Sequence, residues 1–406
     1  MCSELFRIPV ELGGIPLFGV GLLLAVWAVA SGIGVWQLTR KGAPGGDVIY
    51  SLGMAGVVAA LIIFLPRMFP EGLPIRGYGV MLLTGGLSGV LLAAHRARQQ
   101  GLHPDVIYSL AVSLFICGLL GGRLFYVIEY WETRFSKAPW VEVFKFTEGG
   151  LVVYGALMGA IAAFVWFVHK HRLPMLAMAD LIAPSLAIGL AFGRIGCFLN
   201  GCCYGGISDE PWAVRFPIQS PPYGDQLQAG KIAGVILDTD EDGRVIVLPN
   251  ERRHFTDDDV VKTINGQSVK SLVEANRILF KAFRQDEDVR VETAKEVTTV
   301  PARSLPVHPT QLYSAINAAL LCWFLWAYYP FRSRDGEVTA LMLTIYPIAR
   351  FLIEIIRVDE SAVFGTKFSI SQNISIAILV LIAGFWIWLL RQPKVRAFPL
   401  LDVEKD

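Results

Sequence analysis

Charged residues are scarce in this sequence. Only 17% of its 406 residues are Asp, Glu, Lys or Arg, whereas 54% are hydrophobic, and the mean hydropathy is +0.50. Because an ordinary soluble domain carries about 25% charged residues, the composition excludes that class and indicates a polytopic membrane protein. The formal net charge of +1 also lacks the basic excess that nucleic-acid binding requires.

Cysteines and the features of a cleaved leader are also few. Six cysteines in 406 residues do not make a disulfide scaffold. The N-terminus, MCSELFRIPVELGGIP, has no basic n-region and no small-residue cleavage site, and the apolar run after it exceeds the length of a signal peptide. We therefore expect that run to be the first membrane span.

Long apolar runs are abundant, and about 20 apolar residues cross the hydrocarbon core of a bilayer. The sequence predicts an all-α polytopic membrane protein of about nine transmembrane helices. The third and sixth are rich in Gly and Ala, which favours close helix packing. Lys and Arg favour one set of loops by a small margin, which places the C-terminus in the cytoplasm and the N-terminus outside. The nine runs are residues 16–39, 48–65, 78–94, 105–131, 150–168, 176–198, 310–329, 337–356 and 369–390.

The polar segment 208–305 interrupts this pattern and is expected outside the membrane. GVILDTDEDGRVIVLPN predicts a hairpin, DVVKTINGQSVKS a strand ending in an Asn-Gly turn, LVEANRILFKAF a helix and VRVETA a last strand. An insert of this size can fold alone as a small α/β domain. DVVKTINGQSV resembles the matching segment of bacterial PDZ domains, although no Gly-Leu-Gly-Phe-like carboxylate loop is apparent.

Five predicted spans bring polar side chains to the outer side of the membrane, whereas the cytoplasmic ends hold far fewer, mainly Asp180. Intramembrane ionisable residues are costly and usually face a cavity or a partner. The outer group consists of Arg123, Glu129, Tyr154, Arg194, Asn200, His308, Gln311, Tyr313, Asn317, Tyr346, Arg350, Glu354, Arg357 and Asp359.

Cations outnumber carboxylates in this outer group. Tyr346, Arg350, Glu354 and Arg357 follow i, i+4, i+8, i+11 spacing, which places them on one helix face and lets Arg350 pair with Glu354. A purely structural ion pair is one interpretation. The surplus of arginines favours another, an anionic ligand, because guanidinium donates two parallel hydrogen bonds to phosphate. A phosphate-bearing lipid headgroup is the natural anion at that depth.

The stretch GRIGCFLNGCCYGG, residues 193–206, ends the sixth span with a cation, an amide and glycines that allow close backbone approach. We expect it to form one wall of a headgroup pocket. Cys197, Cys202 and Cys203 lack the paired C-x-x-C spacing of a zinc site, with His308 as the sole nearby candidate partner, so no metal is predicted. A disulfide from Cys197 to Cys202 or Cys203, a covalent cysteine intermediate, and plain packing are the alternatives.

The motifs together resemble the prolipoprotein diacylglyceryl transferases. The resemblance covers about residues 75–206 and 307–390, through IRGYGVML, GLLGGRLFYV, GGLVVYGALMG, GRIGCFLNGCCYG, HPTQLY, RFLIEIIR and SISQNIS. It implies a seven-helix enzyme of the bacterial cell (inner) membrane whose active site faces outward. That enzyme moves sn-1,2-diacylglyceryl from phosphatidylglycerol to the lipobox cysteine of prolipoproteins and releases glycerol phosphate. It uses no cofactor, and its partners are these lipids and signal peptides.

The resemblance also carries residue roles. Arg194, Asn200, Arg350, Glu354, Tyr346 and Tyr78 match family motif positions. Together with the chemistry above, this gives a predicted catalytic set of Arg194, Arg350, Glu354, Tyr154 and His308. The predicted phosphatidylglycerol-binding set is Arg194, Asn200, Gly205, Arg123, Tyr78, Tyr346, Gln311 and Arg357.

Three positions depart from the family pattern. Cys197 replaces an asparagine, Cys202 a glutamate, and Tyr154 a histidine that many members carry. The base that accepts the thiol proton is therefore open: Glu354 could act as base or orient Arg350, and His308 is a second candidate. Tyr154 is better suited to donate a hydrogen bond to phosphate.

The expected organisation adds parts to the family core. Residues 1–74 form two additional helices, 75–207 and 306–392 the core, 208–305 the PDZ-like insert, and 393–406 a cytoplasmic tail. The alternative function is a non-catalytic relative that binds phospholipid or prolipoprotein clients. A transporter is disfavoured because its polar residues would line the whole bilayer thickness.

Overall fold

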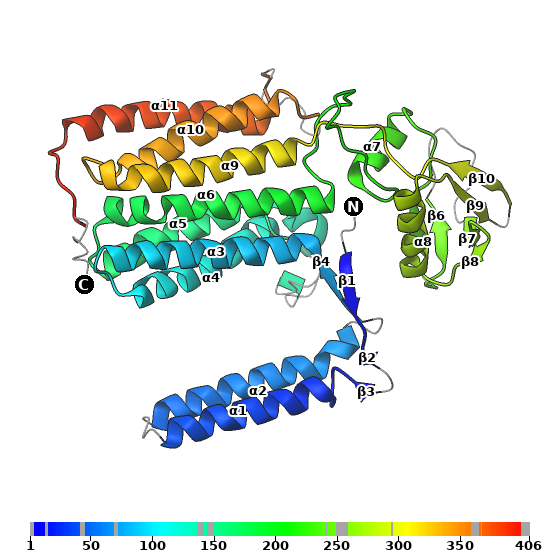
Figure 1. Ribbon diagram of the computed structural model, residues 1–406, viewed down its shortest axis with the longest axis horizontal. Helices are drawn as coiled ribbons and strands as arrows, with labels where there is room; N and C mark the ends of the chain where they lie inside the picture. The colour runs from blue at the N-terminus through cyan, green and yellow to red at the C-terminus, as the bar shows by residue number, and fades with distance from the viewer. Residues whose placement is uncertain are drawn as a thin grey trace. The chain divides into compact units, whose positions relative to one another are not determined.

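A computed structural model gives the fold (Figure 1). It divides into two compact units, residues 2–80 and 81–406, and each is treated by itself below. The residues that the structure describes are 4–12, 15–40, 45–68, 72–136, 142–143, 150–240, 242–248, 259–293, 295–358, 365–366 and 368–398. Asp359, part of the predicted outer group, lies outside them.

The first unit contains a pair of apolar helices, α1 (Leu22–Arg40) and α2 (Gly45–Met68), as the first two apolar runs predict. They pack together, and the Trp27 indole donates to the Ala55 carbonyl at 3.0 Å. The sequence did not reveal two small antiparallel ribbons. Strand β1 (Glu4–Ile8) pairs with the distant β4 (Leu73–Arg76), and β2 (Glu11–Leu12) pairs with β3 (Ile15–Pro16).

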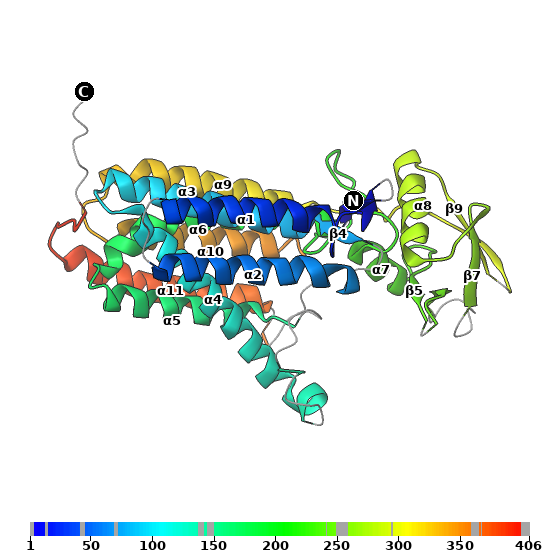
Figure 2. The ribbon, with the colours of Figure 1, turned by 90° about the horizontal axis from the view of Figure 1, so that it is seen from below.

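The second unit is built on a bundle of seven long helices (Figures 1 and 2). Helix α6 is the central one: half of its apolar stretch is buried, a larger share than in the other candidate spans. It contacts α5, α9 and α10. A short π-helix, Trp131–Phe135, follows α4, and a 3-10 turn, Tyr329–Phe331, follows α9. The seven helices are α3 (Gly77–Gln99), α4 (Pro104–Glu129), α5 (Val153–Lys170), α6 (Met175–Asn200), α9 (Thr310–Tyr328), α10 (Glu337–Glu354) and α11 (Ile370–Arg391).

All nine predicted apolar runs are helices, but not all meet the requirements of a span. Among the residues that the structure describes, seven helices are long and apolar enough to cross a membrane: α1, α3, α4, α5, α6, α9 and α11. Helix α10 is 18 residues long and carries Glu337, Arg350 and Glu354, and the apolar stretch 51–64 within α2 is shorter than a span. The chain is therefore a multi-pass membrane protein with seven candidate spans.

Glycines let neighbouring helices approach closely, most clearly between α4 and α5. A Cβ at Gly159 would lie 2.2 Å from the Cys117 carbonyl oxygen, and one at Gly155 would lie 2.5 Å from that of Gly121. Helices α3 and α6 meet in the same way, because a Cβ at Gly85 would lie 2.9 Å from the Phe192 Cβ. Small residues at helix interfaces are the usual basis of association in lipid.

The insert between α6 and α9 folds around its own hydrophobic core. The predicted hairpin, Asn-Gly turn and helix are confirmed, and Asn265 and Gly266 adopt positive φ values of 50° and 75° as such a turn requires.

Two elements of the insert were not predicted: helix α7 (Pro221–Gln228), and strand β10 (Val297–Val300), so VRVETA is not the last strand. The antiparallel order is β10-β9-β7-β6-β5, with β8 beside β7. The other elements are β5 (Leu237–Thr239), β6 (Val245–Val247), β7 (Asp259–Ile264), β8 (Gln267–Ser268), α8 (Leu272–Gln285) and β9 (Val289–Thr293).

The two connections between the insert and the bundle run side by side. Ser208 N–H donates to the Pro306 carbonyl at 3.0 Å, and Val214 and Val307 form a bridge. Phe216 is fully buried against Tyr204 and Val307. The predicted boundaries at 208 and 305 therefore fall inside a paired ribbon that extends the bundle.

The bundle end away from the insert is more polar than the sequence suggested. Asp180 of α6 is fully buried and accepts hydrogen bonds from Gly336 N–H at 2.7 Å and from Thr339 N–H at 2.8 Å. Its carboxylate thus satisfies the open N–H groups at the start of α10. The guanidinium of Arg332, also fully buried, lies 4.0 Å away and donates to the Phe398 carbonyl at 2.9 Å. Asp180 was predicted as the main polar group of the cytoplasmic ends, and the structure adds Arg332 as a buried cation beside it.

Candidate active site

Helix α6 ends in a sharp turn that places the cysteine-rich motif. Gly201 at φ 81° stops the helix in a left-handed conformation, as glycine does readily. Two residues later Cys203 also has a positive φ of 60°, which is uncommon for a residue with a side chain. We refer to residues 202–206 as the cysteine loop.

Side chains and backbone from two other segments fix the cysteine loop. The Gln311 amide donates to the Cys202 carbonyl and the Thr310 hydroxyl to the Cys203 carbonyl, both at 2.7 Å. Gly205 N–H donates to the His308 carbonyl at 2.9 Å, and Gly206 N–H to the Ile356 carbonyl at 2.9 Å. The fold therefore joins the motifs GCCYGG, HPTQLY and RFLIEIIR, which are distant in the sequence.

Gly205 has no room for a side chain at this junction. A Cβ there would lie 2.7 Å from the His308 Cβ and 2.9 Å from a methyl of Thr310. Glycine alone permits this close approach of the backbone to His308 and Thr310.

A small cavity of about 10 Å³ lies between α6, α9 and α10. Guanidinium groups of Arg194 and Arg350, from two different helices, both line it, and the Tyr346 hydroxyl accepts a hydrogen bond from Arg194. Helix α9 contributes Ser314 and Asn317. Asn317 belongs to the predicted outer polar group but not to the predicted site, and Ser314 was not predicted because a serine within an apolar helix gives no distinctive signal.

Glu354 is 5% exposed and joins the cations at the end of α10. It forms the predicted ion pair with Arg350, and its Oε2 lies 3.3 Å from the Arg357 Nη1. Arg357 lies beyond the helix end, so the predicted single helical face does not extend to it. One carboxylate thus faces two guanidinium groups.

The first turn of α11 supports this ion cluster from the side. The Ser369 hydroxyl donates to Glu354 Oε1 at 3.2 Å, and Arg350 Nη2 donates to the Ser371 hydroxyl at 2.8 Å. Ser369 also caps α11 in a capping box with Gln372. The motif SISQNIS had marked this segment, but its contact with Glu354 could not be foreseen without the packing of α10 against α11.

Arg123 is buried among backbone carbonyls. It donates to Val143 O and Glu142 O at 2.8 Å and to Gly150 O at 3.2 Å. These bonds link α4 to residues 142–143 and to Gly150, which lies shortly before α5.

The remaining predicted residues occupy different places. Tyr154, in the first turn of α5, is 45% exposed, and Asn200 is exposed at the last position of α6. His308 Nδ1 lies 3.3 Å from the Tyr313 hydroxyl, which accepts a hydrogen bond from the Trp212 indole at 2.7 Å. Tyr78 belongs to the first unit and is the second residue of α3.

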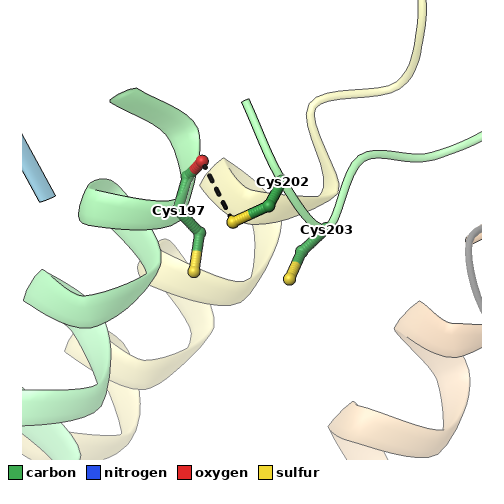
Figure 3. Close-up of side chains that lie close together, drawn as sticks. All are labelled: Cys197, Cys202 and Cys203. Carbon is green, nitrogen blue, oxygen red and sulfur yellow. Dashed lines mark hydrogen bonds between the residues drawn. The ribbon is translucent and has the colours of Figure 1, made fainter. Parts of the chain in front are cut away.

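The three sulfurs of the signature lie together (Figure 3). The Sγ atoms of Cys197, Cys202 and Cys203 are all within 4.8 Å of one another, and all three thiols are free. Hydrogen bonding by Cys197 and Cys202 lowers the pKa of the Cys203 thiol, burial opposes this, and the positive charges of Arg357 and Arg194 reinforce it. The cluster could not be predicted from the cysteine spacing, because a turn after α6 brings the three cysteines together without a C-x-x-C motif.

The structure thus shows a helical membrane protein with arginines from two different helices at one small cavity. The family model of the prolipoprotein diacylglyceryl transferases matches residues 66–388. The chain therefore belongs to the prolipoprotein diacylglyceryl transferase family, and it is a transferase.

Individual relatives agree with this assignment. A phosphatidylglycerol–prolipoprotein diacylglyceryl transferase of Rhodopirellula baltica is 32% identical over 440 residues, covering 93% of this chain and 87% of the relative. The enzyme of the same name from Clostridium tetani is 26% identical, covering 78% of this chain and 93% of the relative. A Gloeobacter violaceus enzyme is 27% identical, with 81% and 93% coverage.

Proposed function

We propose that this protein transfers the sn-1,2-diacylglyceryl group of phosphatidylglycerol to the lipobox cysteine thiol of prolipoproteins. The family assignment and the names of the relatives supply the substrates. The single observation that carries the proposal is the cavity in which Arg194 of α6 and Arg350 of α10 meet, because two guanidinium groups suit one phosphate.

The reaction is a displacement at a glycerol carbon. The acceptor sulfur, as thiolate, attacks this carbon, the carbon–oxygen bond to phosphate breaks, and its electron pair leaves with glycerol phosphate. Arg194 and Arg350 stabilise the negative charge that grows on the departing phosphate. The Tyr346 hydroxyl, bound to Arg194, holds that guanidinium at the cavity wall.

Glu354 is assigned to orientation of the two arginines. Its carboxylate contacts Arg350 and Arg357, and Ser369 donates to its other oxygen. These contacts occupy both carboxylate oxygens, so we assign acceptance of the thiol proton to another group. His308 next to Tyr313 is the candidate within the junction of the cysteine loop, and Tyr154 is a hydrogen-bond donor to the lipid.

Arg357, Gln311 and Gly205 belong to the same wall through the cysteine loop, and Asn200 precedes that loop at the last position of α6. Gln311 and Gly205 fix that loop directly, and Arg357 forms an isolated bridge with Gly205. Their contribution to phosphatidylglycerol binding is therefore to hold the wall in place.

The proposed topology has nine crossings, with α2 and α10 completing the seven candidate spans. Helix α10 keeps its charged groups near its two ends, Glu337 at the first residue, Glu354 at the last and Arg350 one turn before it, so its central part is apolar. In this arrangement the cavity and the insert face the outer side of the bacterial inner membrane, where lipobox cysteines are presented.

Mass spectrometry of a lipobox peptide incubated with purified protein and phosphatidylglycerol tests the function. We expect a diacylglyceryl adduct that is lost in Arg194→Ala and Arg350→Ala, and an unchanged yield in Arg172→Ala, an arginine in the α5–α6 turn. Intact protein that binds phosphatidylglycerol without forming the adduct would instead support the non-catalytic relative.

A further inference from the structure

The thiol cluster is formed by residues that the fold holds rigidly. Cys197 comes from the last turn of α6, and Cys202 and Cys203 come from the cysteine loop. Figure 3 shows the three sulfurs turned into one shared space. Gln311 and Thr310 bind the carbonyls of Cys202 and Cys203, so the loop positions are set by α9.

The spacing of the sulfurs suits a thiophilic metal ion. A zinc–thiolate bond of about 2.3 Å places the sulfurs of a tetrahedral site about 3.8 Å apart. The three Sγ atoms already lie within 4.8 Å of one another.

The electrostatics of the site favour the same occupant. Three thiolates and one divalent ion carry a net charge of −1, and Arg357 lies next to the cysteine loop because its backbone forms a bridge with Gly205. In addition, Cys203 keeps a positive φ of 60° that glycine would adopt more readily.

We propose that Cys197, Cys202 and Cys203 bind one Zn²⁺ through three thiolates and leave its fourth position for the acceptor thiol. The second part rests on the proposed function. A metal-bound thiol releases its proton to solvent and is held as a thiolate. Its sulfur then forms the bond to the glycerol carbon while the carbon–oxygen bond breaks toward phosphate. The metal site thereby supplies a thiolate in a chain that lacks the usual family residues at positions 154, 197 and 202.

Cobalt substitution tests the metal site independently of transfer. Reduced full-length protein in detergent is titrated with Co²⁺, and thiolate-to-cobalt charge-transfer absorption and metal content are measured. We expect one ion per chain, displaced by Zn²⁺. Cys197→Ser, Cys202→Ser and Cys203→Ser should each weaken binding at least about tenfold. Cys322→Ser, which alters a lone buried thiol on α9, should leave it unchanged.

Cys203→Gly is a second variant that removes the thiol and should still fold, because glycine suits the backbone at that position. It should remain monodisperse and still lose the metal. Reduced wild-type protein without charge-transfer absorption, or absorption that persists in all three variants, would overturn the site.

A lipobox peptide then tests the fourth position. Its addition to the cobalt protein should intensify the charge-transfer absorption, and the same peptide with serine in place of cysteine should not. Metal binding without this response would overturn the acceptor part. If transfer proceeds with no metal bound, the inference fails and the function stands; if the metal binds and no transfer occurs, the function fails and the site stands.

Discussion

At the scale of single residues, charge balance determines the site. Glu354 is nearly inaccessible to solvent and is the shared partner of Arg350 and Arg357. Desolvated ion clusters tolerate the loss of one member poorly, because the remaining charges are left buried and unbalanced. The same reasoning applies at the other end of the bundle to Asp180 and Arg332.

Glu354→Gln keeps the shape of the side chain and removes its charge. Without the carboxylate, Arg350 and Arg357 repel each other and the cavity arginine is no longer fixed. We expect the initial rate of diacylglyceryl transfer to fall about 100-fold, in the range for loss of a preorganised electrostatic group. Ser369→Ala removes the hydrogen bond to Glu354 and the cap of α11 but no charge, and should cost about tenfold or less. An equal loss in the two variants would contradict the charge argument.

Asp180→Ala tests the buried carboxylate away from the site. It leaves the N–H groups of Gly336 and Thr339 without their acceptor and Arg332 without its nearby negative charge. We expect a loss of about 3 kcal/mol in the free energy of unfolding, measured by unfolding in detergent. Asp105→Ala, at a carboxylate that is 75% exposed, is the matched control and should be close to wild type.

At the scale of elements, glycine positions decide how closely segments approach. The cysteine loop reaches the strand-like segment 306–308 only because Gly205 has no side chain. Helices α4 and α5 pack backbone to backbone for the same reason. Substitutions at these positions should therefore act through distances between elements.

Gly205→Ala should displace the cysteine loop from His308 and Thr310, because the new Cβ would approach them to 2.7 and 2.9 Å. We expect transfer to fall at least about tenfold while the protein remains folded, as judged by size-exclusion chromatography. The neighbouring Gly206→Ala is the control, since its Cβ would find its nearest atom at 3.5 Å. If Gly206→Ala is the more damaging change, the contact with His308 is not what fixes the loop.

Gly159→Ala tests the α4–α5 interface. Its Cβ would lie 2.2 Å from the Cys117 carbonyl oxygen, so the helices must separate. We expect destabilisation of about 1–3 kcal/mol, typical of overpacking, as a lowered unfolding temperature in detergent. Gly384→Ala on α11 meets no atom within 4 Å and should leave that temperature unchanged.

At the scale of the whole molecule, the insert is attached to the helix bundle through two connections that lie next to each other. Ile218 N–H donates to the Ala302 carbonyl at 3.3 Å, so the two connections are adjacent where they enter the insert. The insert also has its own hydrophobic core. Among the contacts that the structure describes, one side-chain hydrogen bond links the cysteine loop to α7, that of Tyr204 with Asp225.

Replacing residues 219–301 with a short Gly-Ser linker should leave the bundle folded, because the ends to be joined are already paired. We expect transfer to a soluble lipobox peptide to remain within about tenfold of wild type. Tyr204→Phe in the full chain isolates the contribution of the Asp225 contact. A linker variant that folds and transfers nothing, beside an active Tyr204→Phe, would show that the insert itself is needed for the reaction.

The sequence by itself determined the helices and the family motifs. Apolar runs of membrane length and specific local signals, such as the Asn-Gly turn at residues 265–266, act over neighbouring residues, so they can be read without tertiary information. For the same reason the pairing of Arg350 with Glu354, four residues apart on a helix, was predictable.

Only the tertiary structure decided which polar groups meet. Arg123 turned toward backbone carbonyls, Ser369 toward Glu354, and three cysteines of irregular spacing toward one another. These outcomes depend on helix packing and on a left-handed turn at Gly201, which join residues distant in sequence or reverse the chain between them. Local patterns carry no information on such contacts, because their energies arise only when the segments are already in place.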